Sequence, residues 1–327
     1  MTKKTIRVLA AIVVALVLLI AVVERTDDTS PATQHRALLP ELKDRANSIQ
    51  QVRIIAANAD TLTLRQISGT WVNSARDDYA VDIGKLRPLI MALAEARIVE
   101  EKTSSPEHYE KLGVDDPEGG GKGTKIIVDG EGFSYAIILG ESAQGNHRYA
   151  RLADEETSYL VDRDPSIPAA ASDWLLTDIL DIDSKQVRSV TITHDDGEII
   201  AIAKESEDQT DFTVLDIPEG RELSYATVAN GIAAALSALK FDDVRKAIEG
   251  PFETSVVFET WGGLQVTAQV RTDDEDTWVT FFPAGVPDET VTDMSEKLDG
   301  WQYQIPDYKK NLLTRRWDDM LKSADAD

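Results

Sequence analysis

The sequence predicts an α+β protein with an N-terminal transmembrane helix and two related modules of antiparallel sheet, each with helices packed on one face. Three observations predict it. Residues 8–23 contain no charged side chain. Short stretches of alternating apolar and polar residues come next, joined by turns and grouped around an amphipathic stretch, which is typical of antiparallel sheets with helices on one face. The second half of the chain then repeats the element order of the first.

The apolar run Val8–Val23 is expected to span a membrane. Lys3, Lys4 and Arg7 precede it, and this positive flank indicates a cytoplasmic N-terminus. A helix of this length is about 24 Å long, and the flanking cations compensate for its shortfall against a hydrocarbon core of roughly 30 Å. We therefore predict a cytoplasmic tail at residues 1–7, a retained anchor at 8–23 and a polar tether at 24–48, with the bulk of the chain outside the cytoplasm.

A cleaved signal peptide is the alternative interpretation of the same run. Signal peptides end in a site with small residues around the cleaved bond. No such site comes directly after Val23, and the nearest candidate, Ser30-Pro31-Ala32, lies downstream with a proline in its centre. The chain has no cysteine, which excludes a lipid-modified N-terminal cysteine.

The charge balance excludes one class of partner. The chain has 34 basic and 58 acidic residues, which gives a net charge of −24. A field of this sign repels phosphate backbones, so we expect no binding of nucleic acid. Roughly 285 residues come after Pro40, enough for two modules that each bury a core.

The first predicted module covers residues 49–182. Asp82 is a suitable N-cap for a helix whose apolar face includes Ile83, Leu86 and Ile90. A second helix, with Trp174 in it, closes the module. In chain order, the predicted elements are strands at 51–55, 61–65 and 69–72, a helix at 82–101, strands at 125–128, 134–139, 148–152 and 158–161, and a helix at 169–181.

The second predicted module covers residues 183–327. Asp196-Gly197 predicts a tight turn between its first two strands, and Leu264–Val270 alternates as a strand with one buried face. The elements are strands at 186–190, 198–204 and 212–215, a helix at 224–240, strands at 254–258, 264–270, 278–282 and 301–304, and a helix at 307–324 with Trp317. Because the order repeats with a period of about 140 residues, we predict an internal duplication.

Several segments of the first module resemble a known family. The phrase from His108 to Pro117, with Tyr109, Leu112 and Gly113, resembles the Tyr-Gly-Leu-x-x-Pro phrase of the bacterial domain-of-unknown-function 4340 family. Tyr109 precedes Lys111-Leu112-Gly113 here, so the phrase is shifted against the family pattern. The segments around Leu139-Gly140-Glu141, Arg148–Arg151 and Tyr159–Asp162 are similar to the next segments of that family.

The resemblance implies an N-terminally anchored envelope protein of the bacterial inner membrane, with its bulk in the periplasm. It also implies a genomic link to ABC-type transport systems. It implies no activity, cofactor or catalytic residue.

No catalytic motif is found in the chain. Glu118–Thr124 is rich in glycine but lacks the Ser or Thr that comes after the lysine of a phosphate-binding loop. His35, His108, His147 and His194 are not spaced as metal ligands. We therefore predict no catalytic residue, no cofactor site and no metal site, and we expect that the protein is not an enzyme.

Trp261 is the residue that we predict to contact a partner protein. It precedes Gly262-Gly263 in a predicted turn, whereas most other tryptophans lie at positions compatible with a core. Exposed tryptophan carries a disproportionate share of binding energy at interfaces. The leading hypothesis is a non-enzymatic, membrane-anchored extracytoplasmic protein that binds or scaffolds partner proteins of an ABC-type transport or export system. The alternatives are a small-molecule or glycan-binding envelope module, with its ligand in a cleft between the two modules, and a hydrolase with an unrecognised site.

Overall fold

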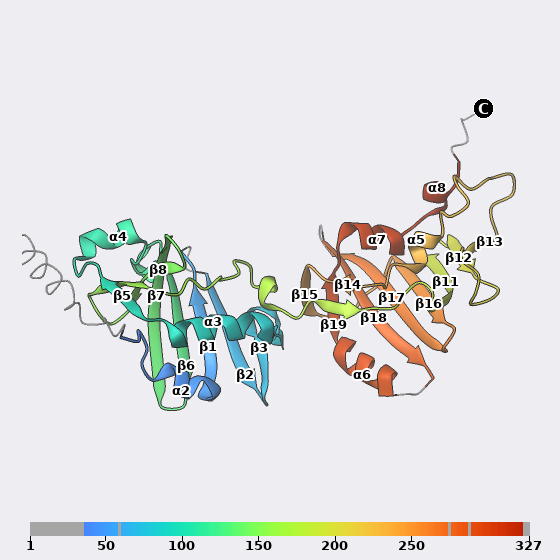
Figure 1. Cartoon of the computed structure of the whole chain (residues 1–327). Helices are drawn as coiled ribbons and strands as arrows, with labels where there is room; N and C mark the ends of the chain where they lie inside the picture. Colours follow the sequence, from blue (N-terminus) through green and yellow to red (C-terminus); the bar gives the residue numbers. More distant parts are fainter. Residues whose placement is uncertain (1–35, 58–59, 274–275, 287–288, 323–327) are drawn as a thin grey trace, which may run out of the picture.

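The computed structural model describes residues 36–57, 60–273, 276–286 and 289–322 (Figure 1). The predicted tail and anchor, residues 1–23, lie outside this range. Among the described helices, none is both long and apolar enough to cross a membrane.

The first sheet has nine strands, all of them antiparallel, in the order β4-β3-β2-β1-β6-β7-β8-β9-β5. Leu86, Leu89 and Leu93 of the helix α3 are buried against one face of it. The strands are β1 (Ile49–Ile55), β2 (Thr61–Ile67), β3 (Thr70–Asn73), β4 (Tyr79–Ala80), β5 (Ile98–Glu101), β6 (Thr124–Gly130), β7 (Phe133–Ala143), β8 (His147–Leu152) and β9 (Ser158–Val161). The helices are α2 (Leu42–Arg45), α3 (Ile83–Glu95) and α4 (Tyr109–Leu112), with short 3₁₀ turns at Ala46–Ser48, Ser74–Arg76, Pro106–His108, Pro117–Gly119 and Ser172–Trp174.

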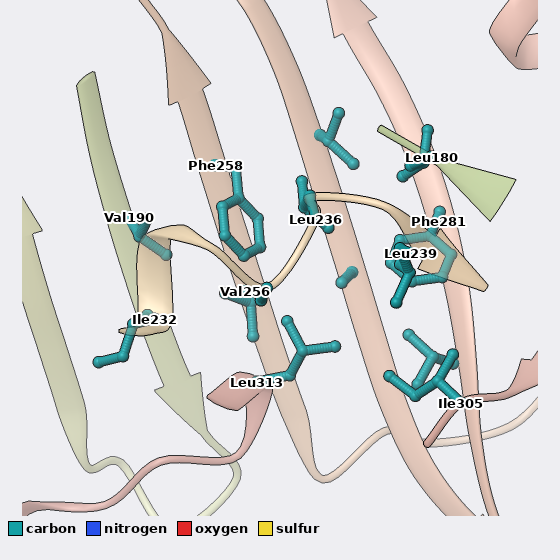
Figure 2. Close-up of a cluster of buried hydrophobic side chains, with 14 of the residues drawn as sticks. Leu180, Val190, Ile232, Leu236, Leu239, Val256, Phe258, Phe281, Ile305 and Leu313 are labelled. Atoms are coloured by element: carbon teal, nitrogen blue, oxygen red, sulfur yellow. The ribbon is translucent and has the colours of Figure 1, made fainter. Parts of the chain in front are cut away.

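The second sheet has eight antiparallel strands in the order β13-β12-β11-β16-β17-β18-β19-β15. Strands and helical turns bury their apolar side chains together on one face of it (Figure 2). Its strands are β11 (Val187–His194), β12 (Ile199–Ala203), β13 (Thr213–Leu215), β15 (Asp243–Lys246), β16 (Thr254–Thr260), β17 (Leu264–Asp273), β18 (Asp276–Gly285) and β19 (Trp301–Gln304). A separate pair consists of β10 (Asp178–Leu180) and β14 (Leu239–Lys240), and the helices are α5 (Asn230–Ala233), α6 (Glu289–Leu298), α7 (Asp307–Leu313) and α8 (Trp317–Met320).

The two sheets have the same strand order, apart from the additional strand β4 at the edge of the first. The first strand of each sheet also has a register shift at the corresponding place. In β1 the shift in pairing with β6 lies between Ile49 and Gln51, and in β11 the shift in pairing with β16 lies between Val187 and Ser189. These shifts are 138 positions apart, whereas aligning Gln51 with Gln186 by sequence gives 135. The register therefore corrects the alignment of the two halves by three residues.

The predicted helices differ from the observed ones in length. Asp82 caps α3 through Gly84 N, which donates to Asp82 Oδ1 at 2.8 Å, as predicted. The helix ends at Glu95 and not at residue 101, because Ile98–Glu101 pairs with β9 as strand β5. The helix predicted over 307–324 is divided into α7 and α8, and Arg316 N donates to Asp319 Oδ2 at the start of α8.

Two predicted helices are wrong over most of their length. The segment 169–181 has only a 3₁₀ turn at Ser172–Trp174 and continues extended into β10, which pairs with β14. The segment 224–240 has the four-residue helix α5 between turns. Gly231 lowers helix propensity there, and buried side chains at 228, 229, 232, 233, 235 and 236 occupy more than one helical face. Whether short apolar runs of this kind become helical is determined by their packing and not by their periodicity.

Two further expectations are corrected. Residues 36–48, predicted as part of a polar tether, pack on the first core, because Leu38, Leu39 and Leu42 bury their side chains there. Not all helices lie on one face of the first sheet: α4 contributes Tyr109 to a small cluster with Ile138. Ile138 lies between the core residues 137 and 139 of β7, so its side chain is on the opposite face.

The two modules are in contact through an aromatic side chain. Tyr79 of β4 belongs to the core of the second module, and its ring lies edge-on to Trp301 at a centroid distance of 4.8 Å. Arg76 forms an ion pair with Asp243 at 2.6 Å between Nε and Oδ1. The first module therefore contributes a core residue to the second.

Candidate functional site around Trp261

Trp261 lines a groove of about 560 Å³ in the second module. The groove lies between the β16–β17 turn, the strand β10 and the helix α6. We refer to it as the Trp261 groove. Its lining residues are 179–182, 186, 207, 260–262, 264, 290, 291, 293, 294, 297 and 298.

The turn that carries Trp261 is held by hydrogen bonds. Its backbone N–H donates to the carbonyl of Gln186 at 2.9 Å. The Thr260 hydroxyl accepts from the backbone N–H of Leu264 at 3.0 Å and donates to its carbonyl at 3.1 Å. Gly263 has a φ of +84°, a conformation that side chains disfavour and glycine permits. The sequence Trp-Gly-Gly therefore specifies a turn that holds the indole in place.

The floor of the groove is apolar. Ile179 and Leu180 come from β10, and both are buried in the second core. Leu298 is buried at the end of α6, and Met294 lies one turn earlier in the same helix. Pockets with an apolar lining and few polar groups are typical of binding sites.

Charged side chains lie at the rim. Lys297 Nζ donates to the carbonyl of Ile179 at 3.0 Å, so this lysine ties α6 to β10. Burial lowers the pKa of Lys297, and the nearby carboxylate of Asp178 opposes that shift. Asp181, Glu207 and Asp293 also line the groove, so carboxylates outnumber ammonium groups around it.

The indole of Trp261 is half-buried. The Arg188 guanidinium carbon lies 5.7 Å from the centre of its ring. Its Nε1–H has no hydrogen-bond partner among the described residues. The structure thus places Trp261 in a groove, where part of the ring remains accessible; that it contacts a partner stays a prediction.

The other tryptophans lie at packed positions. Trp174 is fully buried, and its Nε1 donates to the carbonyl of Pro168 at 3.2 Å. Trp71 packs on the first core, and Trp301 and Trp317 pack on the second. Trp278 is buried beneath the Arg245 guanidinium, whose carbon lies 3.9 Å from the ring centre.

Sequence reasoning missed most of the groove. Residues 179–181 were predicted as the end of the helix 169–181, and α6 was not predicted at all. The apolar residues Val291, Met294 and Leu298 have helical spacing, which is the signal that indicates α6. No local pattern indicates that this helix lies opposite Trp261.

A larger cavity of about 1010 Å³ lies in the first module, between the β1–β2 turn and the segment after β9. Arg148 lines it but is engaged, because it pairs with Asp164 at 3.0 Å and donates to the carbonyls of Gly140 and Pro165. Its guanidinium thus has protein acceptors already, which makes this cavity the weaker candidate for a charged ligand.

The segment His108–Pro117, which resembles the family, is held on the first sheet by side-chain contacts. Arg151 is buried, its guanidinium carbon lies 4.6 Å from the centre of the Tyr109 ring, and its Nε donates to the carbonyl of Val114 at 3.1 Å. The Tyr109 hydroxyl donates to the carbonyl of Glu156. Gly113 has a φ of +65° at the end of α4. These residues fasten α4 to the outer face of the first sheet and do not form a reactive cluster.

Comparison with known proteins gives a family match. A family model described as "Domain of unknown function (DUF4340)" matches residues 71–254, more than half of the chain. The match begins within β3 and ends at the start of β16, so it includes parts of both modules. No curated protein and no solved structure matches the chain.

Proposed function

Because the chain belongs to the domain-of-unknown-function 4340 family, whose description assigns no activity, we propose a function from its site: a non-enzymatic protein that binds partner proteins. We further propose that it is anchored in a bacterial inner membrane, exposes its modules outside the cytoplasm and serves an ABC-type transport or export system. The Trp261 groove is the observation that carries the binding role.

Three properties of the groove support a protein partner. Its floor is apolar, its rim is polar, and a partly accessible tryptophan lies on a turn that hydrogen bonds hold in position. A side chain that is already held in position loses little conformational entropy on binding, so more of its contact energy appears as affinity. Tryptophan in a partly desolvated pocket is a common hot spot.

The membrane and transport parts of the proposal have separate support. The uncharged run 8–23 and the basic residues before it favour an anchored protein with its bulk outside the cytoplasm. The transport link comes from the family resemblance of the segment 108–117 and its neighbours.

The test compares Trp261→Ala with a control in the full-length chain. Tyr308→Ala is the matched control, because Tyr308 is an aromatic residue of α7 that is 64% exposed and does not line the groove. Membranes are crosslinked and extracted with detergent, and captured permease or ATPase subunits are quantified. We expect Trp261→Ala to reduce their capture at least about tenfold, the effect of losing roughly 1.4 kcal/mol of binding energy.

Tyr308→Ala is expected to capture as much partner as the unchanged chain. Equal capture by Trp261→Ala would refute the role of the groove. A chain that is recovered alone, without any envelope protein crosslinked to it, would refute the binding function itself.

A further inference from the structure

Another hollow lies on the outer face of the second sheet, away from its core. Gln269 and Arg271 of β17 and Phe282 of β18 line it, on the opposite face from the buried Val270 and Phe281. The loop 247–253, between β15 and β16, forms its border. Its volume is about 300 Å³, and it shares no lining residue with the Trp261 groove.

Three large apolar side chains border this hollow and remain accessible. Ile248 is 48% exposed, Phe252 is 43% exposed and Phe282 is 46% exposed. Isolated apolar residues on a surface need no explanation, but a group around one concavity is typical of a binding site. The three residues come from two segments that are distant in sequence, so the fold brings them together.

An arginine lies among these apolar side chains. Arg271 Nη1 donates to the carbonyl of Ile248 at 2.9 Å, and its Nε has no partner among the described residues. Asp273, two residues further along β17, pairs with Arg245 at 2.8 Å. Gly250 allows the loop to approach, since a Cβ at this position would lie 3.0 Å from Arg271 Nη1. Because Nε is enclosed, a ligand reaches the guanidinium through its Nη atoms, and among the described residues Nη2 has no hydrogen-bond partner.

An amide group completes the polar part of the hollow. Gln302 of β19 is 3% exposed, its Nε2 donates to the carbonyl of Ile248 at 3.4 Å, and its Oε1 accepts from Arg245 Nε at 3.4 Å, so it supports the loop from below. Gln269 of β17 also lines the hollow and is partly exposed, so its amide is the one that a ligand can reach. Amide side chains both donate and accept, so they suit the N–H and carbonyl of a peptide bond.

We propose that this hollow binds the C-terminus of a partner polypeptide that ends in a large apolar residue. The carboxylate pairs with Arg271, the terminal side chain packs between Phe252 and Phe282, and the last peptide unit lies against the Gln269 amide. Guanidinium groups bind carboxylates with two parallel hydrogen bonds, which explains the choice of a terminal carboxylate.

Size and charge restrict the ligand further. A volume of about 300 Å³ is at the lower end of ligand pockets, so it accepts about one residue rather than a long segment. Glu249 lines the same hollow and disfavours an additional acidic side chain on the ligand. A fatty acid also combines a carboxylate with an apolar part, but it has no peptide N–H for the Gln269 amide.

The experiment measures binding of defined probes to the full-length chain in detergent by isothermal titration calorimetry. The probes are an N-acetylated tripeptide ending in phenylalanine with a free carboxylate, the same peptide as its C-terminal amide, and decanoate. We expect the free acid to bind at least about tenfold more tightly than the amide, because the amide loses the charge-assisted hydrogen bonds.

Matched variants locate the site. Arg271→Gln and Phe282→Ala are each expected to weaken binding of the free acid at least about tenfold. Arg87→Gln removes the same charge from the exposed surface of α3 and is expected to leave binding unchanged. Trp261→Ala is also expected to leave binding of the free acid unchanged. Binding at this hollow and partner capture at the Trp261 groove are therefore tested separately, and either can fail without the other.

Four results would overturn the inference. They are equal affinity for acid and amide, unchanged binding by Arg271→Gln, tighter binding of decanoate than of the peptide acid, and no binding of the peptide acid at millimolar concentration. The comparison of acid with amide uses the unchanged chain, so it remains decisive if a variant does not fold.

Discussion

Tyr303 lies in an aromatic cluster of the second core, and Tyr79 of the first module packs against this cluster. Its ring is tilted against Phe241 at a centroid distance of 5.5 Å, and it is fully buried. Its hydroxyl lies near that of Tyr79 but forms no hydrogen bond of normal geometry among the described residues. A buried hydroxyl without a partner costs about 1–3 kcal/mol, so Tyr303 contributes through its ring and not through its oxygen.

Tyr303→Phe is therefore expected to leave the free energy of unfolding at pH 7 unchanged or to raise it by up to about 3 kcal/mol. Urea denaturation followed by circular dichroism measures the change. A loss of more than about 1 kcal/mol would show that the hydroxyl stabilises the fold.

The same variant has a consequence at alkaline pH. Burial raises the pKa of Tyr303 and of Tyr79 in the folded protein above the ordinary tyrosine value of 10.0. Above pH 10 an unfolded tyrosine releases its proton while the folded one keeps it, so stability falls as pH rises. Tyr303→Phe removes one such group, so the loss of stability between pH 9 and 11 should become smaller by about 1.4 kcal/mol in total. Denaturation at pH 9–11 tests this, and identical slopes would contradict it.

At the scale of elements, α4 shows how a short helix is held on a sheet. Arg151 bonds to the carbonyls of Val114 and Glu155, and the backbone of the α4 segment approaches β7 closely. A Cβ at Gly140 would lie 2.1 Å from the carbonyl oxygen of Leu112. The glycine of Leu139-Gly140-Glu141 is thus required by this contact, and not by a ligand.

Gly140→Ala is expected to destabilise the protein by about 1–3 kcal/mol, because the methyl group forces α4 away from the sheet. Gly119→Ala is the control, since a Cβ at that position has no atom within 4 Å. Thermal unfolding of both variants gives the comparison. Equal midpoints would mean that the segment 109–114 adjusts without cost.

At the scale of the whole molecule, residues that precede the expected boundary at residue 182 are buried in the core of the second module. Leu175, Ile179, Leu180 and Ile182 are buried in the second core, although they precede the second sheet in the chain. Tyr79 enters the same core from the first sheet. The second module is therefore complete only with segments from the first half.

We expect a fragment of residues 172–327 to be several kcal/mol more stable than a fragment of residues 183–327, since each buried aliphatic side chain contributes about 1.5–3 kcal/mol. Urea denaturation of both fragments provides the measurement. If the shorter fragment unfolds at the same urea concentration, the segment 175–182 adds nothing to the second core.

The sequence by itself determined the features that depend on local pattern. Alternating residues such as Leu264–Val270 predict strands, Asp82 predicts the start of α3, and the phrase at 108–117 predicts the family. Each signal resides in a few consecutive residues, because a strand face, a helix cap and a turn are set by neighbours along the chain.

Only the tertiary structure decided the remaining features. The apolar stretches at 169–181 and 224–240 are mostly not helical, although the second has helical spacing, because contacts with distant strands determined their conformation. The Trp261 groove combines segments more than 100 residues apart, from Ile179 to Leu298. Its shape depends on how buried side chains pack across those segments, and a local pattern contains no information about partners so distant in the chain.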